Sequence, residues 1–140
     1  MKTLVVEDDF TSRCLMQRLL SPYGICDVAV NGREAVEAYR RSLESGARYD
    51  LLCLDIQMPE MDGHAVLREV HALQEKAGLF MFDKTRIVMT TVLDDSEDVL
   101  EAFRSQCDAY LLKPIDGDKL VTCLKDLKLI DDDRPRRAAS

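Results

Sequence analysis

Short runs of apolar residues alternate along this chain with longer segments in which apolar residues recur every three or four positions. The short runs have the length and composition of buried strands, and the longer segments have the period of one helix face. The predicted strands are Thr3–Val6, Ile25–Val30, Asp50–Leu54, Ile87–Met89 and Ala109–Leu112. The predicted helices are Phe10–Leu20, Arg33–Leu43, a third that follows Gly63, Glu97–Arg104 and about Asp116–Leu127.

Strand and helix segments that alternate in this way favour a parallel sheet with helices on both faces. We therefore expect one α/β domain of three layers with a doubly wound sheet. The expected domain covers residues 1–129, and the charged residues 130–140 are expected to form a mobile tail. The pattern is weakest between Glu75 and Lys84, a polar and aromatic connection.

Polar side chains follow the ends of the predicted strands. Glu7 and Asp8 follow the first strand, Asp55 ends the central one, and Thr90, Thr91 and Lys113 follow the last two. Because parallel strands end at the same edge of a sheet, these side chains should share one site.

Carboxylates gathered in a partly desolvated pocket repel each other and need a compensating cation. Magnesium fits, because it prefers oxygen ligands and keeps several waters. A lysine and a threonine hydroxyl suit the oxygens of a phosphoryl group, and Asp55 suits the role of nucleophile. The residues alone thus suggest phosphoryl chemistry on Asp55.

Composition narrows the possible partners. The net charge of -7 argues against nucleic acid or an anionic membrane surface, since both require a basic face. The five cysteines show no CxxC spacing, so we expect neither a disulfide framework nor a zinc site. No apolar stretch is long enough to cross a bilayer, which favours a soluble protein of the cytoplasm.

Four segments, taken together and in this order, resemble the receiver domains of bacterial two-component response regulators, and most closely the stand-alone, CheY-like members. They are Val5–Asp9, Asp55–Gly63, Thr91 and Tyr110–Pro114. The resemblance extends from Met1 to about Leu129 and implies a flavodoxin-like sheet of strand order 2-1-3-4-5.

The resemblance also implies a phosphoryl switch. Asp55 would accept a phosphoryl group from a histidine kinase or a histidine phosphotransfer protein. Magnesium would be ligated directly by Asp8, Asp55 and the backbone carbonyl of Gln57, and through water by Glu7. The downstream partner would be a protein, and we expect a monomer or weak dimer.

The remaining roles follow from the same resemblance. Lys113 would pair with Asp55 and then with its phosphate. Thr91 would close onto the phosphoryl oxygen, and Tyr110 would turn inward as Thr91 moves. The Lys113–Pro114 peptide is expected to be cis. Gln57 and Leu93 would line the path of the hydrolytic water.

Several alternatives remain open at this point. Counting back from Lys113 without a gap selects Thr91 as the switch hydroxyl, whereas a one-residue bulge would select Thr90. The site also suits a phosphorelay carrier that passes its phosphoryl group to a histidine. A metal-dependent phosphohydrolase is less favoured because Gln57 stands where a general acid would be needed. A flavin carrier lacks a phosphate-cradling loop after the first strand.

Single features have simpler explanations. Glu7–Asp9 alone would be read as the N-terminus of a helix, where carboxylates are favourable. Only the combination with Asp55 and Lys113 favours a site. His64 and His71 are interpreted as residues of a helix surface without a metal role.

Overall fold

The computed structural model describes residues 1–58, 61–79, 84–92 and 107–131. The predicted helix Glu97–Arg104 and Leu93 lie outside the described residues, as does the expected tail after Asp131. The predicted strands are all present within the described parts of the chain; two have the predicted bounds, and the ends of the other three shift by one or two residues.

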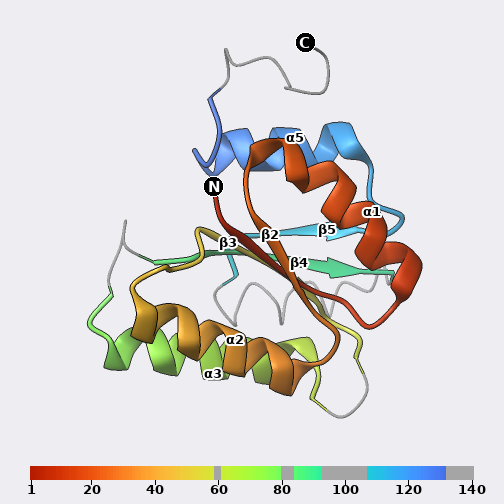
Figure 1. Cartoon of the computed structure of the whole chain (residues 1–140). Coiled ribbons are helices and arrows are strands. Elements are labelled where there is room, and N and C mark those ends of the chain that lie inside the picture. Colours follow the sequence, from red (N-terminus) through yellow and green to blue (C-terminus); the bar gives the residue numbers. More distant parts are fainter. Residues whose placement is uncertain (59–60, 80–83, 93–106, 132–140) are drawn as a thin grey trace.

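The strands form a single parallel sheet in the order β2-β1-β3-β4-β5 (Figure 1). Their bounds are β1 Thr3–Val6, β2 Cys26–Ala29, β3 Leu51–Asp55, β4 Arg86–Thr91 and β5 Ala109–Leu112. This order confirms the flavodoxin-like, doubly wound α/β fold. The central strands β1 and β3 are buried on both faces, which explains their uninterrupted apolar runs.

Helices cover both faces of the sheet, so the domain has three layers. Figure 1 shows α1 (Phe10–Leu20) and α5 (Gly117–Asp126) on one face, and α2 (Gly32–Ser45) and α3 (Gly63–Lys76) on the other. A short 3-10 helix, Ser21–Tyr23, follows α1 and contains Pro22. Each face of the sheet has its own apolar core, one with Met16 and Leu120 and one with Tyr39 and Leu67.

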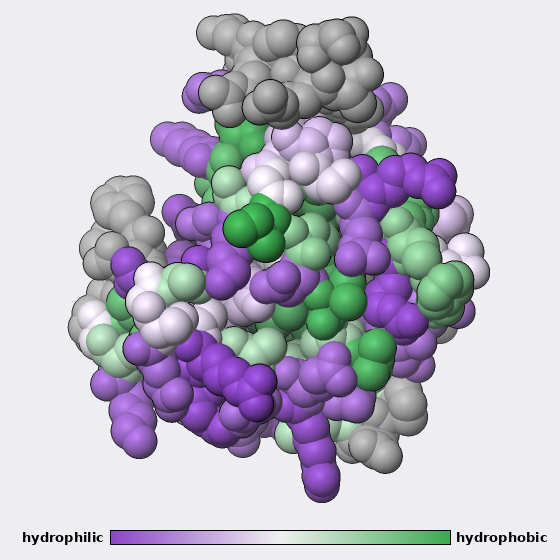
Figure 2. All heavy atoms as spheres, in the orientation of Figure 1, coloured by the Kyte–Doolittle hydropathy of each residue, from purple (hydrophilic) through white to green (hydrophobic). Residues whose placement is uncertain are grey.

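The outer sides of the helices are polar, as expected for surface helices. In Figure 2, hydrophilic side chains dominate the lower part of the molecule, where α2 and α3 lie in Figure 1. On α2, Ala35, Val36 and Tyr39 are buried while Arg40 and Arg41 face solvent. The amphipathic pattern predicted from the sequence is therefore confirmed for α2.

The described α-helices begin at side-chain caps that accept hydrogen bonds from the first turn. The capping residues are Asp9, Asn31, Asp62 and Asp116. These caps lie on the loops that follow β1, β2, β3 and β5, so each cap fixes where a helix leaves the C-terminal edge of the sheet. The last helix was predicted to begin at about Asp116, and Asp116 is its N-cap.

Helix α3 continues to Lys76, beyond the point at which its apolar pattern weakens. The extra turn contains Gln74, a polar residue whose side chain is fully buried. Its Nε2 donates a hydrogen bond to the hydroxyl of Tyr39 on α2 at 2.8 Å. Because this inward-facing residue is polar, the apolar spacing did not predict that the helix includes this turn.

Candidate phosphoryl and metal site

Carboxylates from two adjacent strands meet at the C-terminal edge of the sheet. Glu7 follows β1 and Asp55 ends β3, and both are buried, whereas Asp8 is exposed to solvent. One oxygen from each of the three side chains lies within 4.8 Å of the others. The structure thus brings together the acidic residues that the sequence placed in one site.

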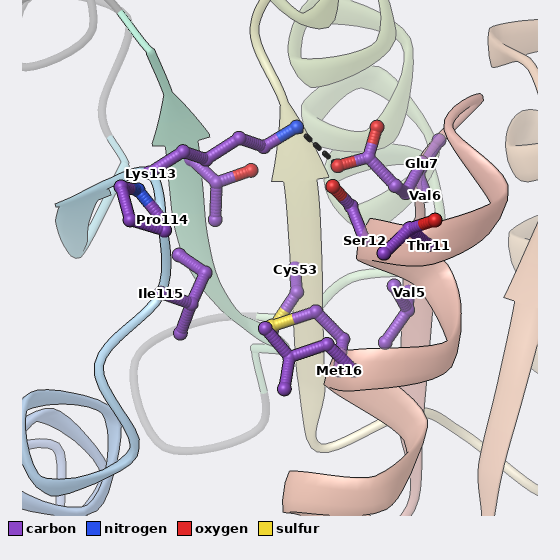
Figure 3. A pocket seen from close by; sticks show the side chains of 12 residues that line it. Val5, Val6, Glu7, Thr11, Ser12, Met16, Cys53, Lys113, Pro114 and Ile115 are labelled. Carbon is purple, nitrogen blue, oxygen red and sulfur yellow. Dashed lines mark hydrogen bonds and ion pairs between the residues drawn. The ribbon is translucent and has the colours of Figure 1, made fainter.

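Lys113 provides the positive charge of this cluster. Its Nζ lies 3.3 Å from Asp55 Oδ2 and forms a short ion pair with Glu7 Oε1. Figure 3 shows Lys113 and Glu7 pointing toward each other from opposite sides of the pocket, joined by this ion pair. The residue after the last strand therefore pairs with acids from the first and third strands.

An apolar cavity lies beneath this ion pair. It has a volume of about 160 Å³ and its walls include Val5, Met16, Cys53 and Ile115 (Figure 3). Such walls keep water away from one side of the charged groups, which strengthens their mutual interactions and raises the cost of leaving any of them unpaired.

The charges of the cluster perturb one another. Burial raises the pKa of Glu7 above its ordinary value, and Asp55 raises it further, while Lys113 acts in the opposite direction. Burial alone would lower the pKa of Lys113, but Glu7 and Asp55 outweigh burial and raise it. Lys113 is therefore held protonated, and Glu7 would be stabilised in its charged form by additional positive charge.

The loop after β1 is held by the helix that follows it. Arg13 Nη1 donates hydrogen bonds of 3.2 Å to the backbone carbonyls of both Glu7 and Asp8. Asp9 accepts a hydrogen bond from the backbone of Ser12, which lowers the pKa of Asp9. Asp9 thus serves as a helix cap, as the simpler explanation proposed, while Glu7 and Asp8 face the cluster.

The loop after β3 is held against Asp55 by a close backbone contact. A Cβ atom on Gly63 would lie 2.6 Å from the carbonyl oxygen of Asp55, so only glycine fits at this position. The Gly63 amide donates to the Ile56 carbonyl at 3.0 Å, and the Gln57 amide donates to Asp55 Oδ1 at 3.0 Å. Glycine at position 63 therefore allows α3 to start beside Asp55.

The donor set suits magnesium. Glu7, Asp8 and Asp55 offer hard oxygen atoms that converge at the edge of the sheet, and the exposure of Asp8 leaves room for water. The combined negative charge of the Glu7 and Asp55 carboxylates exceeds the single positive charge of Lys113, so a dication would compensate the excess. The residues present therefore fit this metal.

The two threonines lie on opposite faces of the sheet. Thr90 is in register with Asp55 and lines the cavity below Lys113. Thr91 is fully buried on the other face, the one that carries Met89 and Tyr110. The ladder of β4 and β5 is continuous from Val88 to Thr91, and the Lys113 amide donates to the Thr91 carbonyl at 2.7 Å. This continuity, without a bulge, favours the count that selects Thr91.

The Lys113–Pro114 peptide is cis, as the resemblance implied. Within the described residues, no helix combines the length and apolar character required to cross a membrane.

A family profile described as the response regulator receiver domain matches residues 3–125. The chain belongs to this family. The receiver domain is similar to chemotaxis protein CheY4 of Vibrio cholerae, with 25% identity and a TM-score of 0.71 over 89% of this chain and 96% of that one. It is also similar to the receiver domain of histidine kinase CKI1 from Arabidopsis thaliana, solved with Mg²⁺, at 28% identity and a TM-score of 0.78, covering 90% of each chain.

Two curated relatives are much longer than this receiver domain. Hybrid signal transduction histidine kinase L of Dictyostelium discoideum is 34% identical over 116 residues, which is 81% of this chain and 6% of that protein. Transcriptional regulatory protein ZraR of Escherichia coli is 32% identical over 123 residues, covering 87% of this chain and 25% of that protein. Receiver domains therefore occur in these relatives as parts of larger proteins.

Sequence reasoning missed Arg13, which holds the carbonyls of the acidic loop. In the sequence, Arg13 is a basic residue in the first turn of the helix that follows Glu7–Asp9. Basic residues are common on helices, so this position alone did not indicate a role. The apolar cavity under Lys113 was also missed, because it depends on the spacing between α1 and the loop after β5.

Proposed function

We propose that this receiver domain accepts a phosphoryl group on Asp55 from a histidine kinase or a histidine phosphotransfer protein, and that the modification alters a protein-binding surface. It would do so as a single-domain response regulator of the cytoplasm, with residues 1–129 as the receiver unit. The observation that carries the proposal is Lys113, whose Nζ bridges Asp55 and Glu7 within a group of convergent carboxylates.

The proposed transfer is a substitution at phosphorus. An oxygen of Asp55 attacks the phosphoryl group, a P–O bond forms and the P–N bond to the donor histidine breaks. The leaving imidazole keeps the electron pair and takes up a proton. Lys113 would then pair with the phosphoryl oxygens in place of the Asp55 carboxylate.

Asp8, Asp55 and the carbonyl of Gln57 would hold Mg²⁺, with Glu7 acting through water. When bound, the metal neutralises charge on the transferring phosphoryl oxygens. The CKI1 receiver domain, a structural relative, was solved with Mg²⁺, which supports this choice.

Thr91 and Tyr110 would convert the phosphoryl group into a change at the surface. Thr91 would hydrogen-bond a phosphoryl oxygen, and Tyr110, on the same face of the sheet, would turn into the space that Thr91 leaves. A shift of a few kcal/mol between the two conformations is enough for such a switch.

Intact mass measurement tests the proposal. With Mg²⁺ and acetyl phosphate, the full chain should gain one phosphate-sized increment, and chelation of Mg²⁺ should prevent the gain. Asp55→Asn removes the nucleophile and should show no gain, whereas Asp62→Asn, a change at a neighbouring helix cap, should still gain it. An unchanged gain in Asp55→Asn would overturn the proposal.

A second function is a phosphorelay carrier. It is favoured by the similarity to the receiver regions of histidine kinases in Dictyostelium discoideum and Arabidopsis thaliana. A carrier would return its phosphoryl group to a histidine phosphotransfer protein faster than to water. A pure switch would lose the phosphate mainly to water, so the rate of loss with and without such proteins separates the two.

A further inference from the structure

Two cavities adjoin at the edge of the sheet opposite the acidic cluster, where β3 and β4 begin. One, of about 290 Å³, lies between α3 and the start of β4, and the other, of about 280 Å³, lies between Tyr49 and the end of α5. Both are lined by Lys84 and Arg86, so the two polar cavities adjoin at these side chains. We call this pair of cavities the basal site.

The basal site is basic although the whole chain carries a net charge of -7. It is lined by four cationic and two acidic side chains: Arg48, Lys84, Arg86, Lys128, Asp50 and Asp108. Both acids are engaged, since Asp108 pairs with Arg86 at 3.5 Å and Asp50 accepts a hydrogen bond from the Lys2 amide at 2.8 Å. Among the described carboxylates, none forms an ion pair with Arg48, Lys84 or Lys128. Excess positive charge of this kind favours an anionic ligand.

The wall of the basal site also contains a buried acceptor without a donor. Thr85 donates to the Tyr49 carbonyl at 2.6 Å, so the 2.7 Å contact between Tyr39 and Thr85 requires the Tyr39 hydroxyl to donate. Tyr39 then accepts from Gln74 Nε2 at 2.8 Å, which fixes the orientation of the amide. Gln74 Oε1 is left buried with no hydrogen-bond partner in the described part of the chain. A ligand that donates a hydrogen bond would satisfy it.

Lys128 is held in the site by a backbone conformation that favours glycine. Its φ is 60°, the only positive φ of a non-glycine residue in the described segments. Lys128 occupies the left-handed position that ends α5, with the Leu129 amide bonded to the Leu124 carbonyl at 2.9 Å. A lysine there incurs strain that glycine would avoid, and a strained residue next to a ligand cavity suggests a functional role for its side chain.

We propose that the basal site binds a small phosphorylated molecule whose other end carries an amino or hydroxyl group. The phosphate is held by Lys84, Arg86 and Lys128, with Arg48 at the rim. The donor group of the ligand would lie against Gln74 and His71, which line the cavity beside α3 and whose Oε1 and Nε2 atoms are buried without a described partner. The site is separate from Asp55 and does not depend on phosphorylation.

Calorimetric titration of the full chain without Mg²⁺ tests the proposal, with AMP and glucose 6-phosphate as probes and with inorganic phosphate and adenosine as fragments. At least one probe should bind more tightly than either fragment. Lys128→Gly and Gln74→Met should each weaken that binding by about threefold or more. Arg48→Gln, a change at an exposed residue of the rim, should weaken it as well. Asp55→Asn, outside the basal site, should leave binding unchanged.

Thermal unfolding of the same variants distinguishes binding from structure. Lys128→Gly relieves a strained φ and should not lower the melting temperature. Gln74→Met removes the unsatisfied Oε1 but also the hydrogen bond from Nε2 to Tyr39, and because these effects on stability have opposite signs the melting temperature should change little. Weaker binding without loss of stability supports the basal site. Absence of binding by both probes at about 1 mM, equal binding of inorganic phosphate alone, or binding unchanged by all three substitutions would overturn it.

Discussion

Lys113 Nζ lies 3.3 Å from Asp55 Oδ2 while it also pairs with the buried Glu7 carboxylate. One lysine thus pairs with two acids that come from separate strands, above an apolar wall. A group that adds negative charge at Asp55 must compete with Glu7 for the Lys113 ammonium. A cation that binds beside Asp55 would reduce the repulsion between the two carboxylates.

Lys113→Met removes the charge but keeps much of the apolar stem. We expect it to lower the free energy of unfolding by about 1–3 kcal/mol at neutral pH, because Glu7 and Asp55 are left buried without a counter-charge. Phosphoryl uptake should fall as well. Urea unfolding measures the stability, and Lys119→Met, at an exposed lysine of α5, is the matched control. A Lys113→Met protein as stable as the unmodified chain would contradict this reading.

Asp8→Asn tests the metal site at its exposed ligand. The loss of one charged oxygen ligand should weaken Mg²⁺ binding by about tenfold or more, while stability without metal changes little because Asp8 is open to solvent. Calorimetric titration with MgCl₂ gives the affinity. Asp126→Asn, on α5 and away from the cluster, should bind Mg²⁺ like the unmodified chain, and equal affinity in Asp8→Asn would remove Asp8 from the ligand set.

The two threonines are predicted to differ in function. Thr91 shares its face of the sheet with Tyr110, whereas Thr90 faces the cavity under Lys113. Thr91→Ala should therefore abolish the change in the Tyr110 amide NMR signal when beryllium fluoride, a phosphoryl mimic, is added with Mg²⁺. Thr90→Ala should retain that change. The opposite result would assign the switch to Thr90.

Cys26 provides a test of pH dependence outside the site. Burial, with a smaller contribution from Asp27, raises the pKa of the Cys26 thiol to about 11. The reactive thiolate is therefore scarce at pH 8, and the alkylation rate of the Cys26 peptide should rise roughly tenfold per pH unit up to about pH 10. Mass spectrometry of the peptide follows the rate. A plateau already reached near pH 9 would show that burial does not hold this thiol neutral.

The sequence was sufficient to predict the layers and the shared edge, because each strand that lines the site has an apolar run that ends in a polar residue. The positions of Glu7, Asp55 and Lys113 follow directly from that pattern. The strand order came from the resemblance alone, since hydrophobic periods do not encode which strands are neighbours.

The basal site was not predicted from the sequence. Gln74 occupies an inward position seven residues after Leu67 and four after Val70, but because it is polar the apolar pattern did not include it. His64 and His71, interpreted as residues of a helix surface, are both half-buried on α3, and each has one ring nitrogen that is buried without a described partner. Partners that come from distant segments, such as Tyr39 and Thr85, are visible only when the helices are packed.

The central claim, that Asp55 itself receives the phosphoryl group, is tested most directly by locating the modified residue. After treatment with Mg²⁺ and acetyl phosphate, borohydride reduces an aspartyl phosphate to homoserine, which peptide mass spectrometry can place. We predict homoserine at position 55 and at no other acidic residue. A reduced residue at Glu7 or Asp8, or none at position 55 in a phosphorylated sample, would contradict the account.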